Sequence, residues 1–166
     1  MTVGTAIAIR KATAGDAAGI WTIRTRAILG GCKDHYETEL LHAWAANPMP
    51  LSFPSFVASE PFYVAEQQSQ VVGFTGLKRE GHQLDAIFVM PELAGRGLGM
   101  RLLRHIESVA RSDGFPLLSL KASLNSIPFY RAAGYSQGAE GTHTTASGLH
   151  IPCVYMEKRL GGVAGV

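Results

Sequence analysis

The chain contains little cysteine and little charge. Its 166 residues include 2 cysteines, and charged side chains make up 17% of the sequence. Cys32 and Cys153 cannot build a disulfide framework and lack the spacing of metal ligands, so reduced thiols and no metal site are expected. Lys and Arg number 15 against 13 Asp and Glu, giving a net charge of +2. So small an excess predicts no nucleic-acid-binding surface.

Long apolar runs are also missing. No stretch approaches the roughly 20 apolar residues of a membrane-spanning helix, although hydrophobic residues make up 46% of the chain. Residues 1–10 do not combine a basic start with a long apolar core, so no signal peptide is predicted. These absences predict a cytoplasmic protein without a membrane partner. The length suits one domain with a full core over residues 1–160, followed by a frayed tail at 161–166.

The hydrophobic pattern switches repeatedly between strand and helix periods. Strands are predicted at 5–10, 62–67, 70–79, 83–90, 117–121, 135–143 and 150–158. Helices are predicted from Asp16, as the N-cap, to Gly30, and over 37–46, 98–112 and 127–133, while 51–60 is either a loop or a short helix. The helix between strands 83–90 and 117–121 implies a parallel crossover. The fold class is therefore α+β, with a mixed, mostly antiparallel sheet of about seven strands and about four helices.

Glycine is unusually frequent, with 19 residues, and Gly95, Gly97 and Gly99 alternate between a predicted strand and a predicted helix. Glycine permits backbone conformations and close approaches that a Cβ would block. The start of the helix presents unpaired N–H groups at the positive end of its dipole, which suits a phosphate or pyrophosphate. The alternative is that these glycines only permit tight packing between the helix and the strand.

The charges and spacing around this loop favour phosphate binding over packing alone. Positive charge near the same helix end is expected from Arg96, Arg101 and Arg104. The run does not match a P-loop, and a dinucleotide-binding fingerprint would need glycine where the chain has Met100.

Two segments resemble a known family. Val89 and Pro91, followed by the run Ala94-Gly95-Arg96-Gly97-Leu98-Gly99, resemble motif A of the GNAT superfamily of acyl-CoA N-acyltransferases. The run from Ser123 to Tyr135, with its Phe129-Tyr130 pair and Gly134, resembles motif B. The two motifs stand in the family's order, about thirty residues apart, and the resemblance extends over nearly the whole chain. It implies the GNAT-like fold, acetyl-CoA or a related acyl-CoA as the donor, and an amine as the acceptor.

The resemblance also assigns contacts with the acyl donor. The pantetheine arm would lie along the strand backbone at Phe88 and Val89, and the pyrophosphate on the loop amides from Ala94 to Gly99. Ala94 stands where the family usually has Gln or Arg. Ser123 stands where the family often has Asn, and Asn125 follows two residues later, so either of these two could contact the donor.

Acyl transfer to an amine needs a base, a donor to the developing oxyanion and a proton donor to the leaving thiolate. The resemblance assigns the proton donor to Tyr130, whose phenol is protonated at neutral pH, and the oxyanion donor to the N–H of Val89. The base is open. Gln83 occupies the position of a catalytic Glu in some members, and Asp85 is the neighbouring candidate, expected to share one strand face with residues 83, 87 and 89. A bulge in this strand, which members of the family often have, would turn Asp85 away, and an exposed aspartate without a role is a further alternative.

Weaker candidates for the base are Tyr36, Glu66, His143 and His150. The segment Tyr36–Trp44 either lines the acceptor pocket or only presents the core face of a helix. The favoured function is an acetyl-CoA-dependent N-acetyltransferase working through a ternary complex, because no cysteine lies in either motif to form an acyl-enzyme.

The acceptor is expected to be a small-molecule amine or a peptide N-terminus. A non-catalytic acyl-CoA-binding module, and a transferase that uses a hydroxyl acceptor or a longer acyl-CoA, are the alternatives. The resemblance also raises a homodimer, since members of the family often pair through their sheet edges.

Overall fold

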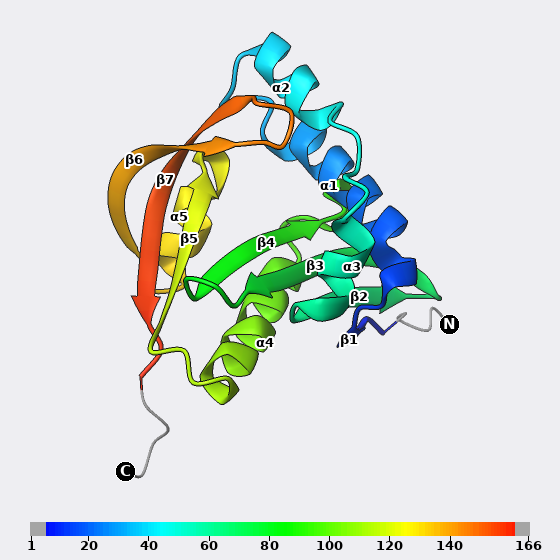
Figure 1. Cartoon of the computed structure of the whole chain (residues 1–166), viewed down its shortest axis with the longest axis vertical. Helices are drawn as coiled ribbons and strands as arrows, with labels where there is room; N and C mark the ends of the chain where they lie inside the picture. Colours follow the sequence, from blue (N-terminus) through cyan, green and yellow to red (C-terminus); the bar gives the residue numbers. More distant parts are fainter. Residues whose placement is uncertain (1–5, 162–166) are drawn as a thin grey trace.

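The computed structural model describes residues 6–161 and confirms the predicted α+β class. Its centre is a seven-stranded sheet in the order β1-β2-β3-β4-β5-β7-β6 (Figure 1). The strands are β1 (Ala8–Lys11), β2 (Phe62–Gln67), β3 (Gln70–Lys78), β4 (Gln83–Val89), β5 (Leu117–Ser123), β6 (Ser136–Thr144) and β7 (His150–Arg159). All neighbours pair antiparallel except β4 and β5, which are parallel as the crossover predicted.

The described residues form five α-helices and three short 3-10 helices. The α-helices are α1 (Ala17–Gly31), α2 (Thr38–Ala45), α3 (Phe53–Ser59), α4 (Leu98–Ser112) and α5 (Ile127–Ala132), and the 3-10 helices are η1 (Ala14–Asp16), η2 (Pro91–Leu93) and η3 (Leu124–Ser126). The expected number of four was one too few, because the ambiguous segment 51–60 contains α3. Pro54 lies in the first turn of α3, where its missing N–H leaves no bond unmade. No helix within residues 6–161 has the length and apolar character needed to cross a bilayer.

Helices α1 and α4 cover opposite faces of the sheet. On β2, Val64 packs in one cluster with Ile20 of α1, whereas the adjacent Ala65 packs with Leu102 of α4. Neighbouring residues of a strand point to opposite faces, so the two clusters are separate layers of the core. All four side chains are fully buried, and burying each of the larger ones stabilises the fold by about 1.5–3 kcal/mol.

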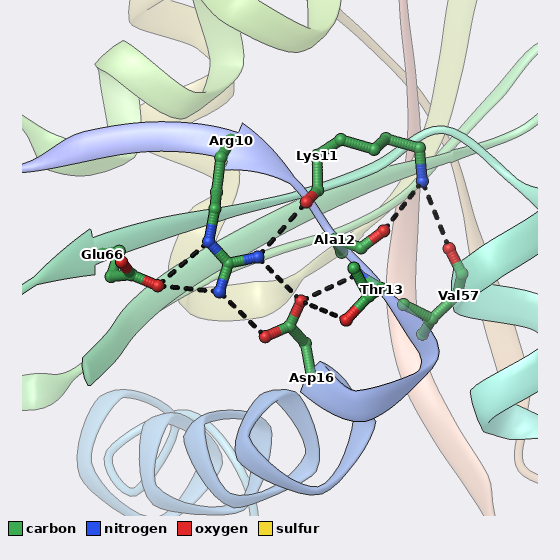
Figure 2. A network of polar contacts seen from close by, with 7 residues as sticks. All are labelled: Arg10, Lys11, Ala12, Thr13, Asp16, Val57 and Glu66. Carbon is green, nitrogen blue, oxygen red and sulfur yellow. Dashed lines mark hydrogen bonds and ion pairs between the residues drawn. The ribbon is translucent and has the colours of Figure 1, made fainter. Parts of the chain in front are cut away.

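Arg10 of β1 joins the first strand to the start of α1 and to β2 (Figure 2). Its guanidinium donates to both oxygens of Asp16, at 2.9 and 3.0 Å, and to Glu66, at 2.7 and 2.9 Å. Asp16 is the N-cap residue of α1, as predicted, but its side chain makes no capping hydrogen bond to that helix. Its carboxylate instead accepts the backbone N–H of Thr13 at 2.7 Å and closes the η1 turn. Hydrogen bonds from Arg10 lower the pKa of Asp16 to about 2.

Strands β4 and β5 separate soon after they meet. Their single shared register position joins Gln83 to Ser119, and the Ser119 N–H donates to the carbonyl of His82 at 3.1 Å. From there β4 continues along β3 while β5 continues along β7, and the two strands fan apart (Figure 1). The sheet therefore opens in its middle, between β4 and β5.

Candidate active site

A cavity of about 1390 Å³ follows the opening between β4 and β5. Its wall is formed by the glycine loop, β4, α5, α1, residues 47–51 and the connection between β6 and β7. The volume exceeds the roughly 300–1,000 Å³ of a pocket for one ligand, so it has room for two substrates. Ten of the predicted site residues lie on this wall, namely Asp85, Phe88, Val89, Ala94, Gly95, Gly97, Gly99, Ser123, Asn125 and Tyr130.

Two of the three glycines of the loop have a backbone conformation that favours glycine. Gly95 and Gly97 have positive φ angles of 77° and 85°, a conformation that costs a residue with a Cβ about 1–2 kcal/mol. Gly99 has no positive φ, and a Cβ there would lie 3.4 Å from the ring of Phe129, an ordinary van der Waals contact. The first turn of α4 and α5 therefore lie close together at Gly99 and Phe129, where the two motifs meet.

The loop presents a row of unused backbone donors. Gly97 precedes the first residue of α4, and the first backbone bond of the helix runs from the Arg101 N–H to the Gly97 carbonyl at 3.1 Å. The six N–H groups from Gly95 to Met100 donate no hydrogen bond to any residue between 6 and 161. They stand at the positive end of the dipole of a 15-residue helix. Such a row of donors is able to bind a phosphate or pyrophosphate.

The arginines contribute less to the loop than the sequence predicted. Arg101 donates to the carbonyl of Ile7 at 3.0 Å, so it is bonded to the segment before β1 rather than to the loop. Arg96 is exposed and does not line the cavity, and Leu98 is buried in the core under α4. Arg96 and Leu98 can therefore serve the cavity only through their backbone N–H groups.

The N–H of Val89 points into the opening between the strands. The next N–H along the chain, that of Met90, donates to the carbonyl of Val72 beside β3 at 2.9 Å. Successive N–H groups of a strand point to opposite sides, so the Val89 N–H points away from β3, where β5 has already diverged. This edge of β4 offers an extended ligand the hydrogen bonds that a neighbouring strand would otherwise take.

Asp85 is the extra residue of a β-bulge. It falls between two residues that pair with β3, Leu84 and Ala86, and has no partner of its own. The bulge shifts the alternation of the strand, so the prediction that Asp85 shares a face with residues 87 and 89 is wrong. Leu84, next to Asp85, packs in the cluster on the α4 side, as do Ile87 and Val89, so the side chain of Asp85 points to the other face. All three of Asp85, Ile87 and Val89 border the cavity.

Asp85 is an exposed residue on the wall of the cavity. Restricted hydration by the surrounding protein raises its pKa to about 6, while Lys78 opposes and Glu60 adds to this shift. A carboxylate with such a pKa is a stronger base than an ordinary one and is still ionised at neutral pH.

Tyr130 brings a phenol to the same cavity. The residue is 7% exposed, and its ring contacts Phe129 and Tyr135 edge-on, with centroids 5.1 and 5.5 Å away. Burial raises its pKa above the ordinary value, so the phenol keeps its proton. Within residues 6–161 its hydroxyl makes no hydrogen bond, and the proton is free for a ligand.

Ser123 and Asn125, the two polar candidates of motif B, differ in whether a hydrogen-bond donor is still unused. The Ser123 hydroxyl donates to that of Ser126 at 3.0 Å, closing a turn. The side-chain oxygen of Asn125 accepts from the thiol of Cys32 at 3.2 Å, while its NH₂ group has no partner among the described residues. Asn125 is thus the better placed of the two to donate into the cavity.

Tyr36 and Trp44 line the cavity as one of the two readings of their segment predicted, whereas Leu40 and Leu41 belong to the core cluster beneath them. The Tyr36 hydroxyl accepts the Leu124 N–H at 3.0 Å and donates to the Pro152 carbonyl at 2.7 Å. Tyr36 thereby joins the end of β5 to the start of β7. Its phenol proton is already donated to the Pro152 carbonyl, so the residue is a poor candidate for the base.

Of the remaining candidate bases, one lines the cavity and two lie outside it. His143 lines the cavity, but Glu66 is paired with Arg10 outside it. His150 lies outside the wall as well, with its ring nitrogen 3.2 Å from the Thr144 hydroxyl. Trp21 and Arg24 of α1 also line the cavity, and neither was predicted from the sequence, because no local motif marks them.

The cysteines lie on the cavity wall, and both are buried. Burial raises the pKa of the Cys32 thiol to about 11 and raises that of Cys153 as well. Protonated thiols are poor nucleophiles, so neither suits an acyl-enzyme. The described residues contain no group of three His, Cys, Asp or Glu side chains placed to hold a metal ion.

Comparisons with known proteins agree with this geometry. Residues 29–135 match the acetyltransferase (GNAT) family. An uncharacterised N-acetyltransferase of Escherichia coli, YafP, is 30% identical over 129 residues, which cover 78% of this chain and 81% of that protein. Among solved structures, a GCN5-related N-acetyltransferase from Rhodopseudomonas palustris superposes with a TM-score of 0.82 at 26% identity, covering 96% of this chain and 99% of the other.

A further solved structure, YncA of Salmonella typhimurium with acetyl-CoA, has a TM-score of 0.64 at 22% identity, with 98% of both chains covered. This likeness concerns the fold. Together with the family match over more than half of the chain, it gives one conclusion: the chain belongs to the GNAT family of acetyltransferases.

Proposed function

We propose that the protein transfers the acetyl group of acetyl-CoA directly to an amine while both substrates are bound. The observation that carries the proposal is the meeting, in one cavity, of the glycine loop, the free edge of β4, Tyr130 and Asp85. The likeness to YncA, which was solved with acetyl-CoA, supports the choice of donor. The two free cysteines suit a reducing compartment, and we place the activity in the cytoplasm.

We assign the parts of the donor to the backbone N–H groups that have no hydrogen-bond partner among the described residues. The loop N–H groups from Gly95 to Met100 would hold the pyrophosphate, and the edge of β4 would hold the pantetheine arm. The donor supplies an acyl thioester when bound. The Val89 N–H would donate to the thioester oxygen as negative charge gathers on it.

Two side chains would move the protons. Asp85, directly or through a water molecule, would take one proton from the acceptor ammonium, which must become a neutral amine before it can attack. The new C–N bond forms as the C–S bond breaks, and the attacking nitrogen gives its second proton to water. Tyr130 would give its own proton to the leaving sulfur. The amide product keeps one N–H, and the phenol recovers its proton from solvent.

A non-catalytic acyl-CoA-binding module would keep the loop and the strand edge but would have no use for Tyr130. The uncommitted hydroxyl of this buried side chain therefore favours the enzyme. A hydroxyl acceptor or a longer acyl group would use the same machinery, and assays with several acyl-CoA donors separate these cases.

The test is an acceptor panel read by thiol release and by mass spectrometry of the product. We expect an acetylated amine to form in equal amount to free CoA, and double-reciprocal plots for the two substrates to intersect. Parallel lines would instead indicate an acyl-enzyme, which the protonated cysteines argue against. Binding of acetyl-CoA without transfer to any amine or alcohol would favour the non-catalytic module.

A further inference from the structure

Arg24 of α1 is a buried cation on the cavity wall without an acidic partner. It is 9% exposed, lies against the cavity and stacks on Trp21, with its guanidinium carbon 4.3 Å from the ring centroid. Each Asp or Glu that forms an ion pair within residues 6–161 is paired with another cation. Burial lowers the pKa of Arg24 to about 10, which leaves it charged at neutral pH.

Its hydrogen bonds leave part of the guanidinium unused. One Nη2 hydrogen is donated to the Trp44 carbonyl at 2.8 Å, and Nη1 donates to the Ala45 carbonyl at 3.5 Å and the Thr25 hydroxyl at 3.4 Å. A guanidinium has five N–H donors, so the Nε–H and one Nη2–H have no partner among the described residues. The Nε is not sealed from solvent, because the one sealed nitrogen without a partner in that part of the chain is His105 Nε2.

Further cations line the same cavity as Arg24. Both Arg24 and Lys121 act to lower the pKa of His143, and both line the same cavity as His143. Lys78 adds a third cation to the wall, whereas Asp85 is the single carboxylate among the described wall residues. The carbonyls at the end of α2 carry a partial negative charge that faces the Arg24 guanidinium. They are not a full counter-ion, which a buried charge normally requires.

We infer that Arg24 binds a carboxylate on the acceptor, so that the acceptor is a small amine carrying a carboxylate, as a free amino acid does. The inference rests on the proposed function and specifies its substrate class. A guanidinium offers a carboxylate two parallel hydrogen bonds, and the stacked Trp21 ring holds the guanidinium in place. Trp44 and Phe53 give the same region of the wall apolar surface for the rest of such a molecule.

The competing role for Arg24 is structural, as a clamp between α1 and the last carbonyls of α2. A clamp would affect stability and all acceptors alike. A carboxylate-binding residue would change the ratio of rates between an acid and its neutral analogue, and this ratio separates the two roles.

The experiment compares free L-amino acids with the corresponding amino acid amides as acceptors, using kcat/KM under the same acetyl-CoA concentration. The wild-type protein should favour the acids by at least about tenfold, the effect of one hydrogen bond to a charged group. Arg24→Gln should abolish this preference while leaving the affinity for acetyl-CoA unchanged, and Arg24→Lys should keep part of it. The control is Arg26→Gln on the same helix, because Arg26 is exposed and pairs with Glu92; it should keep the preference.

The possible results are distinguishable. Amides that react as well as the acids, or a preference that survives in Arg24→Gln, would overturn the inference. Acetylation only of amines that lack a carboxylate would overturn the inference too, while leaving the proposed function intact. Absence of acetyl-CoA binding would instead defeat the proposed function, and the inference with it. Thermal unfolding of each variant checks that the protein is folded in every comparison.

Discussion

Gln83 of β4 lies opposite Ser119 of β5, and these two residues form the single register position shared by the two parallel strands. Everything that makes the cavity follows from this early separation. Past Gln83, β4 keeps one edge without a strand partner, and Val89 lies on that edge, just before the glycine loop. The opening thus places backbone donors for two parts of an extended ligand next to each other.

Replacing Tyr130 with Phe should lower kcat by about 10²-fold, the lower end of what a positioned acid contributes. The affinity for acetyl-CoA should change little, because the ring remains in place. The free energy of unfolding should also change little, since the hydroxyl makes no hydrogen bond with the described residues. Steady-state kinetics and calorimetric binding measure the two effects separately.

The matched control is Tyr135→Phe. The Tyr135 hydroxyl donates to the buried Glu107 at 2.7 Å, so this variant should lose about 1–3 kcal/mol of stability but retain kcat. Equal loss of kcat in the two variants would remove Tyr130 from the role of proton donor.

Gly97→Ala should weaken binding of acetyl-CoA by about tenfold or more, because a Cβ disfavours φ = 85° and moves the N–H groups of the loop. The strain should also cost about 1–2 kcal/mol of stability. Gly114→Ala is the control, since Gly114 has φ = 82° and equally open space for a Cβ, yet follows the far end of α4. Equal losses of affinity in both variants, measured by calorimetry, would mean that the loop only shapes the fold.

The activity should fall as the pH drops through about 6. Asp85 must be ionised to accept a proton, and its pKa is raised to about 6, so kcat/KM should rise up to that pH and level off above it. Asp85→Asn should lower the rate and remove this limb from the pH profile, whereas Asn in place of the exposed Asp34 should leave it unchanged. A limb that persists in Asp85→Asn belongs to another group.

The ion pair between Arg10 and Asp16 should make the free energy of unfolding decrease as the pH falls. Because the folded-state pKa of Asp16 is lowered from 3.8 to about 2, its contribution is complete above about pH 4 and is lost as the pH falls toward 2. Asp16→Asn should cost about 1–2 kcal/mol at pH 7, and this difference should narrow at pH 3, as measured by urea unfolding. Glu92→Gln, which breaks an exposed pair with Arg26, should change stability by less.

The sequence predicted most of the helices and strands and the glycine loop before α4, because these depend on local signals. Gly95 and Gly97 are tied to their positions by backbone conformation, and Tyr130 follows a motif of fixed spacing. Asp85 was found as a candidate for a partly wrong reason, since the bulge that places it depends on pairing with a different strand.

The part of the cavity proposed to bind the acceptor was predicted from the sequence only at Tyr36 and Trp44. Arg24 sits between ordinary helix residues, and its lack of a counter-ion appears only when α1, α2 and the loop between β6 and β7 come together. The contact between Ser147 and Asn47, 2.8 Å apart, joins segments a hundred residues apart, and no local pattern marks it. Long-range packing therefore decides the part of the cavity that would select the acceptor.

The most direct test of the account is a calorimetric titration of the full chain with acetyl-CoA. The account predicts saturable binding of one molecule per chain, weakened in Gly97→Ala and retained in Gly114→Ala and Tyr130→Phe. No binding by the folded wild-type protein would contradict the assignment of the cavity to the acyl donor.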